Sequence, residues 1–227
     1  MPRVLEVGLA ALLLAMLSPL LLIVVLANRL AGGAVFFRQV RLGRGLVPFT
    51  ILKFRTMAPP PPGATTVAGA DRARITALGR LLRASKIDEI PQLINVLRGE
   101  MSLVGPRALT PNEIARVPLE LSRAVYAVRP GMTGLASLVF SDEERQVLAS
   151  ADPEAHYFAA ILPQKMWLET AYARRRGLTL DLLLLALTPL AMISPAAARA
   201  LARRLAWSGD APAGAAPQMP SGEASDG

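Results

Sequence analysis

The stretch "VLEVGLAALLLAMLSPLLLIVVLA" occupies Val4–Ala27 and is interrupted only by one glutamate and by Ser18-Pro19. As a straight helix it would extend about 36 Å, enough to cross a bilayer core of about 30 Å. Pro19 lacks a backbone donor and clashes with the Ala15 carbonyl, so it predicts a kink. We expect the Ser18 hydroxyl to bond back to the Leu14 carbonyl. The kink leaves arms of roughly 20 Å and 13 Å, neither long enough to span.

Basic residues flank this segment on both sides. Because Lys and Arg concentrate on the cytoplasmic side of a membrane, we expect both ends of residues 1–30 on one side, as a re-entrant hairpin. A transmembrane anchor remains the alternative, since membrane spans tolerate proline. The flanking residues are Arg3 before the segment and Arg29, Arg38, Arg41 and Arg44 after it.

The rest of the composition limits the chemistry. The 227 residues include no cysteine and a single histidine, His156, which excludes disulfides, thiolate zinc sites and multi-histidine metal sites. The net charge is +8, and residues 29–107 hold 13 Lys or Arg against 4 Asp or Glu. Such a basic block suits phosphate-bearing partners: an anionic membrane surface, a nucleotide or nucleic acid.

Strand and helix patterns alternate along the remaining chain. Ala34–Met57 indicates two strands around a Gly-x-Gly turn, and Ala58–Ala70 a proline- and glycine-rich loop. Val128–Phe140 indicates a turn and a strand, and a helix is expected around "YFAAILPQKMWLETAYARRR". Leu178–Ile193 is apolar but short for a span, which is typical of an interfacial helix.

The C-terminal end continues this interfacial pattern. Arg199, Arg203, Arg204 and Trp207 suit a membrane-surface rim. Residues 208–227 are rich in Gly, Ala, Pro and Ser and predict a disordered tail.

Two adjacent acids, Asp88 and Glu89, stand inside the basic block between two helical patterns. Their structural interpretation is a helix start, because Ser85-x-x-Asp88 has capping-box spacing and Pro91 suits a first turn. The helix before them places Ile75, Leu78 and Leu82 on one face; the helix after them places Ile90, Leu93, Ile94 and Leu97 on one face and stops at Gly99.

Their functional interpretation is a reactive group beside a phosphate site. On a helix Asp88 shares a polar face with Gln92 and Asn95, and Arg80, Arg83 and Arg107 flank the turn. A carboxylate and a diphosphate repel each other unless arginines, or Mg²⁺ held by carboxylates and phosphate oxygens, neutralise them. An ionised Asp then attacks phosphorus and forms an acyl phosphate. No P-loop or GxGxxG motif is present.

Four blocks carry a resemblance to a known family. They are "FFRQVRLGRGLVPFTILKFRTM", "ITALGRLLRASKIDEIPQLINVLRGEMSLVGPR", "RPGMTGLAS" and "ILPQKMWLETAY", and they stand in the family's order. Over roughly residues 4–193 the chain resembles the small monotopic polyprenyl-phosphate phosphoglycosyl transferases, also called bacterial sugar transferases. Three places depart from the family pattern: Lys86-Ile87 before the acids, Ala108 after Gly-Pro-Arg, and "GGAV" before the first strand.

The resemblance implies an activity and its site. The family transfers a phospho-sugar from a UDP-sugar to polyprenyl phosphate, usually undecaprenyl phosphate, and releases UMP by a ping-pong path with Mg²⁺. Asp88 then corresponds to the nucleophile and Glu89 to its partner in metal binding or acceptor activation. The residues implied in substrate binding are Lys53, Arg55, Arg80, Arg83, Pro106 and Arg107, and Ser18-Pro19 matches the family's helix break.

The resemblance also implies an architecture. We expect a mostly α, α+β monotopic membrane protein on the cytoplasmic face of the bacterial inner membrane. Its predicted parts are a re-entrant helix hairpin at 1–30, a catalytic domain at 31–177, interfacial helices at 178–207 and the tail at 208–227. Membrane lipids and downstream glycosyltransferases are the other expected partners.

Two other classes stay open on the residues alone. Two short helices around "RASKIDE" fit a membrane-tethered helix-turn-helix protein that binds nucleic acid. Asp88 and Glu89 would then lie at the start of the recognition helix, where acids repel phosphates, so we expect no nucleic-acid partner. A non-catalytic membrane scaffold is the third interpretation. The sequence identifies neither the sugar nor the pathway.

Overall fold

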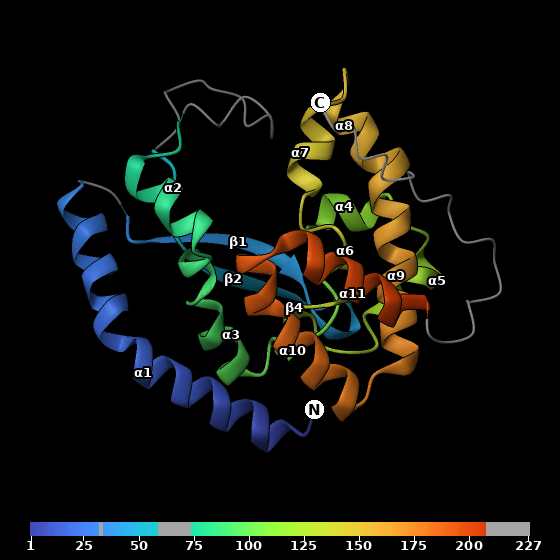
Figure 1. Ribbon diagram of the computed structural model, residues 1–227, viewed down its shortest axis with the longest axis horizontal. Helices are drawn as coiled ribbons and strands as arrows, with labels where there is room; N and C mark the ends of the chain where they lie inside the picture. Colours follow the sequence, from blue (N-terminus) through green and yellow to red (C-terminus); the bar gives the residue numbers. More distant parts are fainter. Residues whose placement is uncertain (32–33, 59–73, 208–227) are drawn as a thin grey trace.

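The computed structural model describes residues 1–31, 34–58 and 74–207. Within them, helices predominate over two small two-stranded sheets (Figure 1). This confirms the mostly helical α+β class. The loop predicted at Ala58–Ala70 lies outside the described residues from residue 59 onward, and so does the tail predicted at 208–227.

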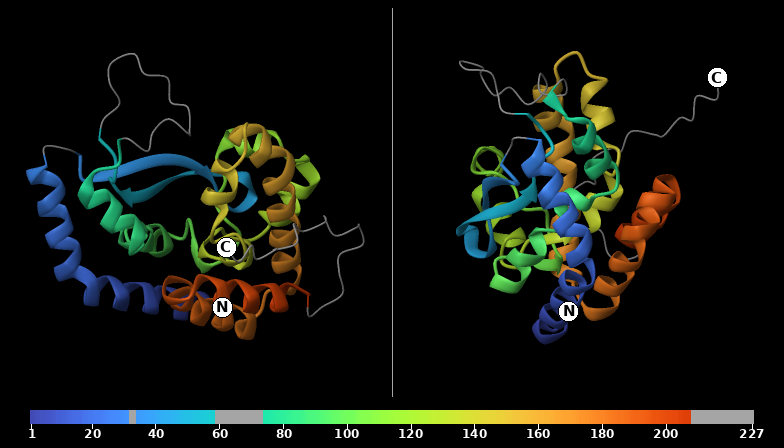
Figure 2. Two further views of the ribbon diagram at one scale, coloured as in Figure 1. Left: turned by 45° about the horizontal axis from the view of Figure 1, so that its top comes forward. Right: turned by 90° about the vertical axis from the view of Figure 1, so that its left-hand side faces the viewer.

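The apolar segment forms helix α1 (Arg3–Leu30), which bends sharply near its middle (Figures 1 and 2). Pro19 lies inside the helix, and Ser18 Oγ donates a 2.8 Å hydrogen bond to the Ala15 carbonyl. The bond goes to Ala15 and not to Leu14 as predicted. The reason is that Pro19 has no N–H, which leaves the Ala15 oxygen without its helical donor.

Both ends of α1 contact the rest of the chain. Near its start, the Arg3 guanidinium donates to the Val96 carbonyl of helix α3 (Gln92–Arg98). Near its other end, Val24 packs in a buried cluster with Phe54. Between these contacts the outward side chains are apolar and exposed; they include Leu12, Met16, Leu22, Ile23 and Leu26. Among the described residues, α1 is the helix long and apolar enough to cross a membrane.

An antiparallel hairpin follows α1. Strands β1 (Phe36–Leu42) and β2 (Pro48–Phe54) are joined through a short 3₁₀ turn, Arg44–Leu46. Gly45 has a φ of +68°, a conformation that glycine adopts without a steric penalty. The two strands and the Gly-x-Gly turn predicted from the sequence are therefore confirmed.

Asn95 of α3 joins this hairpin to the helix. Its side chain is fully buried; Oδ1 accepts from the Leu52 N–H at 3.1 Å, and Nδ2 donates to the Thr50 carbonyl at 2.8 Å. The polar face that includes Asn95 was predicted to line a site. At Asn95 this face instead makes a structural contact with β2. α3 ends at Gly99, with a φ of +84°, as predicted.

Helix α2 (Ala77–Ala84) precedes the acids. It starts later than predicted: Thr76 caps it by accepting from the Gly79 N–H at 2.9 Å, so Ile75 lies before the helix. The capping box predicted at Ser85 is wrong. Ser85 ends α2, with its hydroxyl bonded back to the last turn, and Lys86 reverses the chain with a φ of +56°.

A second sheet pairs β3 (Ser102–Val104) in parallel with β4 (Gly131–Thr133). The backbones approach so closely that a Cβ on Gly131 would lie 2.0 Å from the Gly105 nitrogen. The strand predicted within Val128–Phe140 is therefore only three residues long and is followed by a helix. The helices around this sheet are α4 (Pro111–Ala115), α5 (Leu119–Val125), α6 (Leu135–Val139), α7 (Glu143–Leu148), α8 (Pro153–His156) and α9 (Leu162–Arg175), with a π-helical turn at Tyr157–Ile161 before α9.

Two helices complete the described chain: α10 (Leu178–Ile193), which is apolar, and α11 (Pro195–Trp207). They lie along the same side of the molecule as the first half of α1 (Figure 2, left). Arg199 differs from its prediction: it forms an ion pair with Asp142, and both side chains are only 18% exposed. It therefore fastens α11 to the protein and does not belong to a membrane rim.

Asn95→Ala tests the link between α3 and the hairpin. The substitution leaves the Leu52 N–H and the Thr50 carbonyl without their side-chain partner, so we expect a loss of about 3 kcal/mol in the free energy of unfolding. Denaturant unfolding of the detergent-solubilised protein measures it. The exposed Asn112→Ala is the control and should change stability by less than about 0.5 kcal/mol; equal effects of the two substitutions would contradict this role.

Candidate active site

The two acids lie on a 3₁₀ turn, Ile87–Glu89, between α2 and α3. The left-handed conformation of Lys86 turns the chain here, so Asp88 points inward and is only 8% exposed. Asp88 Oδ1 is buried and accepts no hydrogen bond within the part of the chain that the structure describes. Burial, and next the charge of Glu89, raise the pKa of Asp88 above its ordinary value.

Glu89 has a partner. Lys53 of β2 donates to Glu89 Oε1 at 2.7 Å, an ion pair that the hairpin register places at the turn. Burial alone would raise the pKa of Glu89, but Lys53 and then Arg107 outweigh it and hold that pKa below its usual value. The neighbouring acids are therefore shifted in opposite directions, and such a divergence is common where two carboxylates have different chemical roles.

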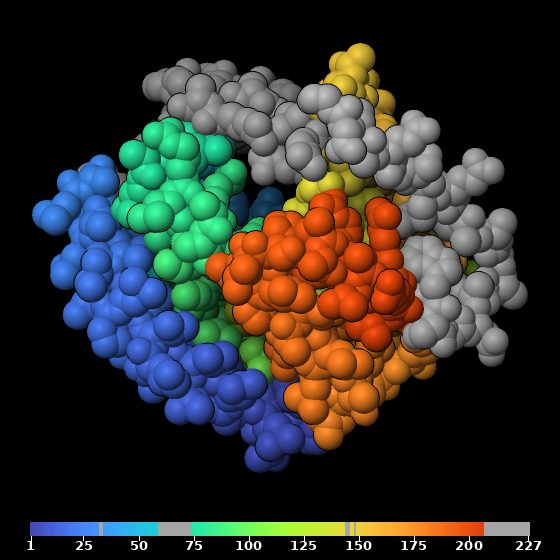
Figure 3. Space-filling view, viewed as in Figure 1, coloured from blue at the N-terminus to red at the C-terminus, as the bar shows by residue number. Residues whose placement is uncertain are grey.

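Exposed cations surround the buried Asp88. Lys86 and Arg83 interact electrostatically with Asp88, and Arg107 with Glu89. Arg83 is oriented by Thr56, whose Oγ1 accepts from its Nε at 3.2 Å. Figure 3 shows a hollow between α2 and the C-terminal helices, with the β1–β2 hairpin at its floor. α2 and the hairpin carry Arg83 and Lys53, so an anion entering this hollow would meet positive charge.

Two of the predicted binding residues lie apart from the acids. Arg55 Nε donates to the Met57 carbonyl at 3.1 Å, and the exposed Arg80 reaches the Ile75 carbonyl at 3.5 Å. Neither guanidinium forms an ion pair with Asp88 or Glu89. The structure thus brings together Lys53, Arg83 and Arg107 of the predicted set, and leaves Arg55 and Arg80 on backbone contacts beside α2.

The Gly105-Pro106-Arg107 turn is fixed by its backbone. Pro106 is fully buried, while the Arg107 side chain is exposed. The Arg107 N–H donates to Glu169 Oε1 at 2.9 Å, and the Tyr126 hydroxyl donates to the Arg107 carbonyl at 2.5 Å. The Arg107 side chain therefore extends from a backbone that hydrogen bonds hold in place.

A network that the sequence analysis did not identify lies on the far side of Arg107. Lys165 of α9 pairs with Glu143 at 2.7 Å, and the Tyr157 hydroxyl donates to Glu113 at 2.8 Å. The charges of Glu143 and Glu113 both act on Arg107. Two signals were available: the four-residue spacing of Lys165 and Glu169 on one helix face, and the Thr-x-x-Glu capping box that ends at Glu113.

The acids also fit a magnesium ion. Mg²⁺ typically takes one or two carboxylates and completes its shell with phosphate oxygens and water. Asp88 offers a buried, unpartnered Oδ1, and Glu89 follows it directly in the turn. No cluster of three or more acidic or histidine ligands occurs among residues 1–31, 34–58 and 74–207, so the phosphates would have to supply the remaining ligands.

Comparison with known proteins gives consistent matches. A relative in Caulobacter vibrioides, a UDP-glucose:undecaprenyl-phosphate glucose-1-phosphate transferase, is 52% identical over 143 residues, which cover 60% of this chain and 52% of the relative. A Klebsiella pneumoniae protein of the same name is 33% identical over 190 residues, 82% of this chain and 38% of the relative. An uncharacterised sugar transferase of Bacillus subtilis, EpsL, is 40% identical over 137 residues, 60% of this chain and 67% of EpsL.

The matched part of the chain therefore spans about half the length of the first of these relatives and less of the second. The model of the family described as bacterial sugar transferase matches residues 1–195, a range that holds α1, the acids and the network around Arg107. The chain belongs to the bacterial sugar transferase family.

Proposed function

We propose that the protein transfers a sugar phosphate from a UDP-sugar to undecaprenyl phosphate. The observation that carries this proposal is the buried, unpartnered Asp88 Oδ1 beside a Glu89 that is held by Lys53, within a ring of exposed cations. The names of the relatives support undecaprenyl phosphate as acceptor and UDP-glucose as the first donor to test.

We propose a reaction in two steps. Asp88 attacks the β-phosphorus of the UDP-sugar; a bond forms between its carboxylate oxygen and phosphorus, and the diphosphate bridge breaks, so that UMP leaves with the electron pair. Arg83, Lys86 and Arg107 attract the diphosphate. An oxygen of the lipid phosphate then attacks the same phosphorus and releases Asp88. Glu89, kept ionised by Lys53, stabilises cations near the phosphates and orients the incoming acceptor.

A magnesium ion would be held by Asp88 and Glu89 together with diphosphate oxygens. When bound, it neutralises charge between the carboxylates and the phosphates. The other roles belong to residues of the chain. Arg83 and Arg107 position the donor, and burial keeps water from Asp88.

The contacts of α1 support a re-entrant position in the membrane. Arg3 at one end and Val24 toward the other contact the same part of the protein, and the bend at Pro19 makes both contacts possible. We infer that the helix enters and leaves one leaflet, on the cytoplasmic face of the inner membrane. α10 and α11 would then lie at the same interface.

Intact-protein mass spectrometry with Mg²⁺ and UDP-sugars, without lipid acceptor, tests the covalent step. We expect the mass of one phospho-sugar to be added to the wild type and to Asp152→Asn, an exposed control, together with release of UMP. Asp88→Asn should gain no mass. A wild type that turns over lipid phosphate and shows no adduct under rapid quench, or an Asp88→Asn that still forms one, would contradict the proposed nucleophile.

Single cysteines test the course of α1, because the chain has no native cysteine. Pro2→Cys and Ala31→Cys stand at opposite ends of the helix, and both positions are exposed. If α1 is re-entrant, a membrane-impermeant maleimide should label both in inside-out vesicles and neither in intact spheroplasts. Asn112→Cys serves as the reference for the catalytic domain. Opposite accessibility of positions 2 and 31 would indicate a spanning helix.

Glu169 supports the Arg107 turn, and its burial has a consequence for pH. It is 3% exposed, and burial raises its pKa to about 7, against the hydrogen bond from the Arg107 N–H. A carboxyl whose pKa is higher in the folded than in the unfolded state binds more protons when folded. The fold therefore loses stability as pH rises from the unfolded value of 4.5 to about 7.

Glu169→Gln should remove this dependence, because glutamine keeps an acceptor for Arg107 and does not ionise. We expect the wild type to lose up to about 3 kcal/mol more than Glu169→Gln between pH 4.5 and 7.5. Denaturant unfolding across this range measures the difference. Glu154→Gln, at an exposed position, should follow the wild type. Parallel curves for wild type and Glu169→Gln would show that Glu169 does not titrate in this way.

A further inference from the structure

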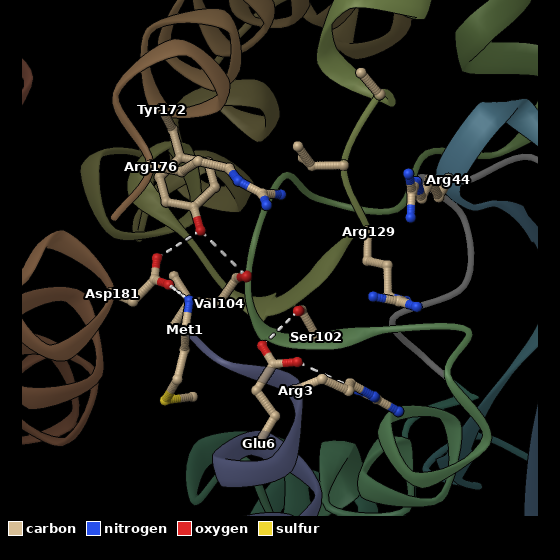
Figure 4. Close-up of a pocket in the computed structure, with 12 residues that line it drawn as sticks. Met1, Arg3, Glu6, Arg44, Ser102, Val104, Arg129, Tyr172, Arg176 and Asp181 are labelled. Carbon is tan, nitrogen blue, oxygen red and sulfur yellow. Dashed lines mark hydrogen bonds and ion pairs between the residues drawn. The ribbon is translucent and has the colours of Figure 1, made fainter. Parts of the chain in front are cut away.

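A second polar site lies away from Asp88, where α1 and α10 begin. It is a cavity of about 220 Å³, bounded by the first turns of α1, by β3, by the segment 127–129 and by the start of α10 (Figure 4). Since a water molecule takes about 30 Å³, the space is large enough for a phosphate group and some hydration. None of its lining residues belongs to the candidate active site.

The acids of this cavity already have partners. Glu6 Oε1 accepts from Ser102 Oγ at 2.5 Å, and Glu6 Oε2 accepts from Arg3 at 3.3 Å. Asp181 accepts from the Tyr172 hydroxyl at 2.7 Å. Both carboxylates are at most 3% exposed. They connect α1 and α10 to the domain and are not free to hold a cation.

The arginines of the cavity, in contrast, have unused donors. The side chains of Arg44 and Arg176 make no hydrogen bond or ion pair with the residues that the structure describes. Arg129 uses its Nε for the Gly99 carbonyl at 2.8 Å, which leaves its two terminal nitrogens. In Figure 4 the guanidinium groups of Arg44, Arg129 and Arg176 surround the same open space. Three guanidinium groups without an acidic partner form a cationic site suited to an anion.

We propose that this cavity binds a phosphate group through Arg44, Arg129 and Arg176. Guanidinium groups match phosphate oxygens in planar, paired hydrogen bonds, and each adds a charge-assisted contact. The cavity opens where the two apolar helices start, so the phosphate comes either from the headgroup of an anionic phospholipid or from a free phosphate in solution. Binding joins the turn between β1 and β2, the 127–129 segment and the C-terminal end of α9, and it does not depend on the transferase reaction.

Amide hydrogen exchange of the full chain in phosphatidylcholine nanodiscs tests the site. The segment 127–133 is followed after either of two additions, about one fifth phosphatidylglycerol in the bilayer or inorganic phosphate in solution. We expect slower exchange with at least one of them. Protection by phosphatidylglycerol alone identifies a lipid headgroup, and protection by inorganic phosphate identifies a free anion. No protection of the wild type by either addition overturns the proposal.

A charge-matched pair of variants separates the cavity from general attraction. Arg44→Gln with Arg176→Gln should bind the effective ligand about tenfold more weakly, the loss expected for two charge-assisted contacts. Arg123→Gln with Arg174→Gln removes the same charge from exposed positions outside the cavity and should match the wild type. Equal weakening in both variants, or none in the first, contradicts the site. Hydrogen exchange of residues 85–93 at the wild-type rate, measured without either addition, shows that the first variant is folded.

Discussion

The structure depends on one constraint: a single apolar helix must contact the same domain at both ends. Arg3 bonds to the Val96 carbonyl at the end of α3, and Val24 packs against Phe54 at the end of β2. A straight helix cannot satisfy both contacts, and the bend at Pro19 allows them. Since β2 and α3 also flank the turn that carries Asp88 and Glu89, α1 and this turn share their supports. If α1 lies in the membrane as proposed, the residues that fold the domain also fix where the candidate active site lies relative to the lipid.

The pKa values of the two adjacent acids depend on the residues around each of them. Asp88 and Glu89 stand on one turn, yet Lys53 forms its ion pair with Glu89. Burial therefore raises the pKa of Asp88, whereas at Glu89 Lys53 and then Arg107 outweigh burial and lower the pKa. The difference arises from the register of the hairpin, which sets Lys53 opposite one acid. Sliding β2 by one residue would turn Lys53 to the other face of the strand and remove the ion pair with Glu89.

Local patterns predicted much of the fold, and contacts distant in sequence account for the rest. The hairpin with its turn at Gly45 and the end of α3 at Gly99 follow from backbone geometry, which a short stretch specifies. The pair Asp88 and Glu89 was predicted from its charge environment. The ending of α2 at Ser85 was missed because Lys86 adopts a left-handed conformation that residue type does not favour. The role of Asn95 required knowledge of β2, 43 positions away, and no periodicity contains that information.

The β3–β4 pair connects the two polar regions of the molecule. β3 lines the cavity that holds Arg44, Arg129 and Arg176 at Ser102. It runs directly into the Pro106-Arg107 turn of the candidate active site. Arg129 stands two residues before Gly131, whose N–H donates to the Pro106 carbonyl at 2.8 Å. The backbones meet too closely at Gly131 for a side chain to fit. The two segments therefore have little room to move relative to each other. A shift of the backbone at Arg129 would therefore either strain this contact or carry the Arg107 turn with it.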